Sequence, residues 1–141
     1  MVDDVALNKV ASIERCLNRV REEYADQPEN LNHQTKQDAI ILNLLRACEA
    51  AIDLAMHLVS RFRLGVPQES RDAFELLVGA NLLQRPLGDA MKRMVGFRNV
   101  AVHDYQKLSL PIVRLIIEER LTDFAEFSRA ALAAAQAPSA I

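Results

Sequence analysis

The stretch over residues 40–59 limits the fold more than any other part of this chain. Apolar residues recur there around most of the circumference of the helix that the pattern predicts. The polar exceptions follow one another at steps of three or four and form one narrow stripe: Asn43, Arg46, Glu49, Asp53, His57 and Ser60. A surface helix normally exposes a wider polar face, so this helix must be covered on nearly every side. We expect it to pack inside a helical bundle and, with the apolar surface left over, against a second copy of the chain.

The remaining pattern consists of further helices separated by short breaks. Proline and asparagine at residues 26–30, glycine and proline at residues 64–67, and Pro86 interrupt the apolar periodicity. The predicted helices span 3–25, about 33–63, about 69–83, a segment that begins at Pro86 and a segment that begins at Pro111. We expect an all-α antiparallel bundle of four main helices plus a short one. It would form a single domain over 1–137, followed by a frayed tail over 138–141.

The charge of the chain is distributed unevenly. The formal net charge is −2, yet residues 85–114 carry six basic and two acidic side chains, a local charge of +4 that leaves −6 for the rest. A positive site on an acidic body can accept an RNA phosphate without binding nucleic acid indiscriminately. Charge scattered over the surface without any function explains the same numbers equally well.

The cysteines and the apolar runs indicate where in the cell the protein is expected to be. Cys16 and Cys48 both fall inside helical apolar patterns, which favours two buried free thiols in a cytoplasmic protein over a disulfide. Charged residues interrupt the one apolar run that approaches the length of a membrane span, and the N-terminus shows no basic and apolar leader. No Cys/His spacing is typical of zinc, so neither a metal nor a cofactor is expected.

Residues 98–105 read Arg-Asn-Val-Ala-Val-His-Asp-Tyr and contain the side chains needed to cleave RNA without a metal. The guanidinium of Arg98 holds a phosphate by paired hydrogen bonds at any working pH, and His103 gives or takes a proton near neutrality. Five positions along a regular α-helix place the two side chains about 140° apart. We therefore expect the helix to end or distort near Val102, or the two residues to face different subunits.

The spacing alone also fits a purely structural role. A buried Arg98 paired with an acid, and a His103 near a helix C-terminus, where a cation is favoured, would produce the same pattern. In the catalytic interpretation, the amide of Asn99 would hold the arginine or the RNA. Asp104 would then support the charged form of the neighbouring imidazole.

The pattern Arg-polar-x-x-x-His-x-Tyr resembles the signature of the HEPN superfamily of ribonucleases. With Tyr105 it is most similar to the HepT toxins of prokaryotic HepT/MntA toxin–antitoxin pairs, and less specific matches lie at 47–55 and 72–77. The resemblance implies a metal-independent endoribonuclease that cleaves tRNA or mRNA by attack of the ribose 2′-hydroxyl. It also implies that Arg98 and His103 are the catalytic pair in a cleft at a homodimer interface, with Asn99 and Asp104 in support.

The same resemblance implies a protein partner. An MntA-like nucleotidyltransferase antitoxin would bind the chain in a hetero-oligomer and neutralise it by transferring AMP from ATP to Tyr105. The added phosphodiester would place negative charge two residues from His103 and repel RNA phosphates. Tyr24, on the apolar face of the first helix, is expected to stay unmodified.

Two other functions remain open at this point. One is a non-catalytic helical dimer that binds and supports a nucleotidyltransferase, with Arg98 and His103 holding a nucleotide. The other is a structural dimer in which the motif only stabilises a helix end. The polar stripe also has two interpretations: a solvent-facing strip with an ion pair between Asp53 and His57, or the floor of a groove in which Glu49, Asp53 and His57 lie beside Arg98 and His103.

Overall fold

In the computed structural model, which describes residues 2–137, every regular element is helical. The predicted all-α class is therefore confirmed, whereas the predicted frayed tail at 138–141 lies outside the described residues. The elements in chain order are α1 (Asp4–Tyr24), η1 (Pro28–Asn32), α2 (Gln34–Arg61), α3 (Ser70–Gly79), α4 (Arg85–His103), η2 (Tyr105–Lys107), α5 (Leu110–Leu115), η3 (Ile116–Arg120) and α6 (Leu121–Ala135).

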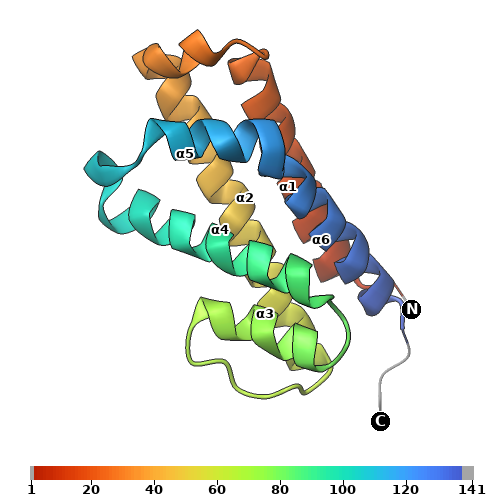
Figure 1. Ribbon diagram of the computed structural model, residues 1–141. Helices are drawn as coiled ribbons and strands as arrows, with labels where there is room; N and C mark the ends of the chain where they lie inside the picture. The colour runs from red at the N-terminus through yellow and green to blue at the C-terminus, as the bar shows by residue number, and fades with distance from the viewer. Residues whose placement is uncertain (1, 138–141) are drawn as a thin grey trace.

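Helices α1 and α2 form the antiparallel pair on which the other helices pack (Figure 1). Helix α1 begins where the Asp3 carboxylate accepts a 3.0 Å hydrogen bond from the backbone N–H of Ala6, a typical N-cap. It ends where Ala25 adopts the left-handed conformation. One face of α1 is buried along its whole length: Ala6, Val10, Ile13, Leu17, Val20 and Tyr24.

Helix α2 runs through the middle of the molecule, and α1, α3, α4 and α6 all pack against it (Figure 1). The narrow polar stripe is present, except that Asn43 is only 9% exposed and donates its amide to the carbonyl of Ala39. Packing within one chain thus covers most of the apolar surface of α2. The expected second copy of the chain is not tested by a single chain, and Leu42 on α2 remains 43% exposed.

The short helix α3 is held at its start by a capping box between Glu69 and Asp72. It ends at Gly79, four residues before the predicted end at 83, because the chain turns at Asn81 with a φ of 62°. Helix α4 then begins at Arg85 with Pro86 in its first turn, as the position of the proline predicts.

The predicted helix from Pro111 onward is continuous but not regular. Ile116–Arg120 forms a π-helical turn between α5 and α6. Such a turn inserts an extra residue and redirects the helix, and Figure 1 shows α5 and α6 running in different directions. As a result α6 packs along α1 and α2, while α5 lies near the end of α4.

Candidate functional site

Arg98 lies in the last third of α4 with its guanidinium at the junction of α2, α3 and α4. Its Nη1 is 3.3 Å from both carboxylate oxygens of Glu49 on α2. Its Nη2 donates to the Ser70 hydroxyl at 2.9 Å, and its Nε donates to Asn99 Oδ1 at 3.0 Å. Three helices therefore hold the guanidinium in one orientation, while the side chain remains 19% exposed.

Ser70 was not among the residues that the motif singled out. It lies 28 residues before Arg98, in the first turn of α3, and no local pattern connects the two. Their contact arises because α3 packs against α4. Only the packing of the bundle could have identified Ser70 as a partner of the arginine.

His103 is the last residue of α4, where the backbone N–H of Asp104 still bonds to the carbonyl of Val100. The helix thus ends one residue after Val102, in agreement with the expectation that it ends near there. The imidazole is exposed, and within residues 2–137 no hydrogen bond or ion pair fixes it or joins it to Arg98. A single chain therefore presents a fixed guanidinium and a freely accessible imidazole on one helix without bringing them into contact.

Asp104 does not contact the neighbouring imidazole. Its Oδ2 lies 3.2 Å from the ammonium nitrogen of Lys107, three residues further on. This ion pair joins the cap of α4 to the following turn.

Tyr105, two residues beyond His103, is 43% exposed. Its hydroxyl donates to Asp38 Oδ1 at 2.7 Å, a partner 67 residues away that the sequence did not indicate. Partial burial, together with the adjacent Asp38 carboxylate, raises the pKa of Tyr105 to about 12. At neutral pH its hydroxyl is therefore protonated and accessible.

The second tyrosine differs in accessibility. Tyr24 is 2% exposed, and its hydroxyl donates to the carboxylate of Glu118. Burial and that carboxylate raise the pKa of Tyr24 to about 12 as well. Of the two tyrosines in the chain, Tyr105 alone has an exposed side chain.

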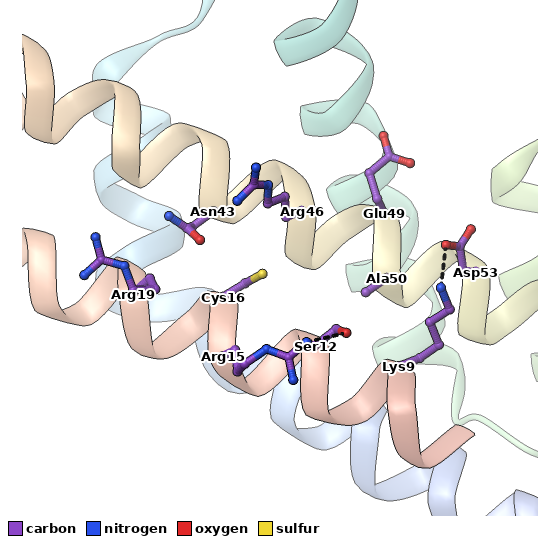
Figure 2. Close-up of a pocket in the computed structure, with 10 residues that line it drawn as sticks. All are labelled: Lys9, Ser12, Arg15, Cys16, Arg19, Asn43, Arg46, Glu49, Ala50 and Asp53. Carbon is purple, nitrogen blue, oxygen red and sulfur yellow. Dashed lines mark hydrogen bonds and ion pairs between the residues drawn. The ribbon is translucent and has the colours of Figure 1, made fainter. Parts of the chain in front are cut away.

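Two of the three acidic and histidine side chains of the α2 stripe line a groove, and the third does not. Glu49 contacts Arg98, and Asp53 pairs with Lys9 on α1 at 3.1 Å. Both line a groove between α1 and α2 (Figure 2). His57, Arg98 and His103 are not among the residues that line this groove. It is therefore a different groove from the predicted one, which lay beside Arg98 and His103.

The expected ion pair between Asp53 and His57 is wrong. His57 Nε2 instead lies 2.8 Å from Asp3 Oδ2, which also accepts from Arg61 at 3.0 Å. The N-cap carboxylate of α1 is held beside this end of α2, so it reaches the imidazole in place of the residue one turn away.

The described part of the chain has neither a cluster of metal ligands nor a helix that could span a membrane. Over residues 2–137, no group of three His, Cys, Asp or Glu side chains is arranged to hold a metal ion. None of the helices in that range has the length and the hydropathy needed to cross a bilayer.

The model of the ribonuclease HepT-like family matches residues 12–131 of this sequence. The chain belongs to this family. An mRNA nuclease HepT from Shewanella oneidensis is 48% identical over 126 residues, which cover 89% of this chain and 95% of that protein. A putative RNase from Archaeoglobus fulgidus is 26% identical over 109 residues, or 75% of this chain and 82% of that protein.

Solved structures of toxin–antitoxin proteins match the HepT-like chain over nearly its whole length. A toxin–antitoxin crystal structure with AMP-PNP has a TM-score of 0.89 at 46% identity and covers 93% of this chain and 99% of that one. A tri-AMPylated Shewanella oneidensis HEPN toxin in complex with an MNT antitoxin also has a TM-score of 0.89 at 46% identity, with 94% and 99% covered. The HepT resemblance, the HEPN-like bundle and the ribonuclease class predicted from residues 98–105 are thereby confirmed.

Proposed function

We propose that this HepT-like chain is the toxin of a toxin–antitoxin pair and a metal-independent endoribonuclease that cleaves mRNA or tRNA. One observation carries the proposal. Glu49 and Ser70 hold the guanidinium of Arg98 in place, and His103, five residues later in the chain, is exposed. The 48% identical relative is an mRNA nuclease, which supports the same activity here.

The proposed reaction needs one positive group and two proton transfers. The ribose 2′-oxygen attacks the adjacent phosphorus, the bond from phosphorus to the 5′ oxygen breaks, and the products carry a 2′,3′-cyclic phosphate and a 5′-hydroxyl. Arg98 neutralises the charge that builds on the non-bridging oxygens, with Asn99 keeping the guanidinium oriented. His103 takes the proton of the 2′-hydroxyl or gives one to the leaving oxygen, and Asp104 acts on it through charge alone.

A homodimer is part of the proposal, because one chain does not join Arg98 to His103. A second copy would supply a second imidazole, so that one histidine acts as base and the other as acid. Four exposed apolar side chains lie beside this end of α4 and on α5, where burial against another copy would remove them from water: Val100, Val102, Ile112 and Leu115.

Neutralisation would occur at Tyr105. An MntA-like nucleotidyltransferase transfers AMP from ATP: a bond forms from Tyr105 Oη to the α-phosphorus, pyrophosphate leaves, and Asp38 is placed to receive the phenolic proton. The tri-AMPylated state of the matching HEPN toxin supports this mode of control. RNA as substrate and ATP as donor would both be met in the cytoplasm, where two free thiols, Cys16 and Cys48, also persist.

The direct test uses the chain purified without its antitoxin and incubated with cellular RNA in EDTA. Wild type should cleave and leave 2′,3′-cyclic phosphate ends, whereas Arg98→Ala and His103→Ala should each reduce cleavage by at least about a hundredfold with the fold intact. His33→Asn is the matched control, since His33 is an exposed histidine whose Nδ1 caps α2 and asparagine preserves a cap.

Intact RNA with every protein, while mass spectrometry shows an unmodified Tyr105, would overturn the proposal. That result would favour the non-catalytic alternative, a helical dimer that binds and supports a nucleotidyltransferase. Loss of folding in both motif variants would favour a purely structural role for Arg98 and His103.

A further inference from the structure

We infer that the groove between α1 and α2 binds the sugar–phosphate backbone of the RNA next to the phosphate that is cleaved. The inference rests on the proposed ribonuclease function and assigns this surface a substrate-positioning role. The groove has a volume of about 480 Å³ and lies outside the Arg98–His103 motif (Figure 2). Glu49 connects the groove to the motif, because it lines the groove and is the ion-pair partner of Arg98.

Two guanidiniums at this groove have no acidic partner. Within residues 2–137, no carboxylate lies in ion-pair range of Arg46 on α2 or of Arg15 on α1, and Arg15 bonds only to the Ser12 hydroxyl at 3.1 Å. By contrast, Arg19 at the same groove is paired with Glu22 and Glu23. Exposed arginines without a carboxylate partner are the side chains best suited to bind phosphate.

The two arginines line the same groove from opposite helices. Figure 2 shows the Cys16 thiol directed into the space between α1 and α2, with Arg46 on one side and Arg15 on the other. Partial burial raises the pKa of Cys16, while the charges of Arg46 and Arg15 both oppose the rise. Two positive side chains from facing helices therefore border the space around Cys16, and the inference places a neighbouring phosphate of the RNA there.

The groove is continuous with the proposed catalytic arginine. Glu49 lines the groove and also accepts the hydrogen bonds of Arg98. An RNA strand with its cleaved phosphate on Arg98 would pass Glu49 and bring a neighbouring phosphate to Arg46 and Arg15. The carboxylate of Glu49 repels the strand between the two positions and so favours phosphates at the two cationic ends.

The lining of the groove also indicates what is recognised. None of the ten residues that line it is aromatic, so it offers no surface for base stacking. Contacts from guanidinium groups to phosphates position a strand without reading its sequence. We therefore expect the groove to strengthen binding of every RNA longer than the cleaved dinucleotide, whatever its bases.

The test combines Arg15→Gln, Arg46→Gln and the double variant with two substrates. Each single change should lower kcat/KM for a twelve-nucleotide RNA by about fivefold, mainly through KM, and should reduce the salt dependence of binding by about 0.7 in logarithmic slope. A dinucleotide with a single phosphodiester does not reach the groove, so its kcat/KM should stay unchanged. Arg129→Gln, which removes an exposed guanidinium from α6, is the matched control.

The outcomes separate this inference from the proposed ribonuclease activity. Unchanged cleavage of the long RNA, or an equal loss with both substrates, would overturn the role of the groove. If wild type cleaves no RNA, binding of a labelled twelve-nucleotide RNA to wild type, Arg46→Gln and Arg129→Gln still decides the matter. Weaker RNA binding by Arg46→Gln alone would support the role of the groove in binding RNA. Equal binding by all three proteins would overturn that role.

Discussion

Arg98 on α4 and Glu49 on α2 form an ion pair in which Nη1 of the arginine lies 3.3 Å from each carboxylate oxygen. The carboxylate fixes the guanidinium in the free protein. The same carboxylate also competes with an RNA phosphate for it. The Glu49 carboxylate therefore orients Arg98 and, at the same time, opposes the binding of an RNA phosphate to it.

Glu49→Gln should lower the KM for RNA by about two- to threefold with kcat retained. The amide oxygen still accepts from Arg98, whereas the negative charge that repels phosphate is gone. The free energy of unfolding should change by less than about 1 kcal/mol, since the ion pair is partly exposed. Steady-state kinetics in EDTA measures the effect, with Glu126→Gln on α6 as the control. A higher KM would mean that Glu49 assists substrate binding.

Ser70→Ala should lower kcat/KM by about three- to tenfold, because Nη2 of Arg98 loses its 2.9 Å acceptor. The loss should fall mainly on kcat if Arg98 acts on the charge of the transition state. Ser70→Thr retains the hydroxyl and should restore most of the activity. If the threonine variant is as impaired as the alanine variant, the hydroxyl does not position Arg98.

Asp38→Asn should lower the pKa of Tyr105 from about 12 toward the ordinary value of 10.0. The physical reason is that the Asp38 carboxylate repels the phenolate and accepts a hydrogen bond from the neutral hydroxyl. Absorbance titration of phenolate in a Tyr24→Phe background isolates Tyr105, since the chain has two tyrosines. An unchanged titration midpoint would show that Asp38 does not control this hydroxyl.

Asp3→Asn should destabilise the fold by about 1 kcal/mol at neutral pH. Burial raises the pKa of Asp3, but hydrogen bonds from the Ala6 N–H, His57 and Arg61 lower it below 3.8 overall. A depressed pKa contributes stability above the unfolded value, and that stability is lost as the pH falls through the folded value. The difference in the free energy of unfolding between wild type and Asp3→Asn should therefore become smaller below about pH 4, as measured by urea unfolding. Asp4→Asn, at an exposed neighbour, serves as control, and a penalty independent of pH would contradict the prediction.

Gly88→Ala should destabilise the contact between α3 and α4 by about 1–3 kcal/mol. A Cβ at Gly88 would overlap Cγ2 of Val78, whose branched side chain has little freedom to move. Val78→Ala in the same chain should recover part of the loss. Gly96→Ala is the matched control, because its Cβ would meet only the flexible end of Arg71. Equal unfolding temperatures of Gly88→Ala and Gly96→Ala would contradict this account.

The sequence by itself determined the helices, because their apolar periodicity and their caps are local. Asp3, Pro86 and Pro111 each lie at a predicted helix start and have the role there that their side chains favour. The motif over residues 98–105 likewise predicted the ribonuclease family, since its residues are neighbours in the chain. The narrow polar stripe of α2 was visible for the same reason.

Only the tertiary structure decided which side chains meet across helices. The contacts of Arg98 with Ser70, of Tyr105 with Asp38 and of His57 with Asp3 join residues 28, 67 and 54 positions apart. Such pairs depend on the crossing of packed helices, which leaves no periodic signal in the chain. For that reason the sequence could not predict that two unpaired arginines would line one groove.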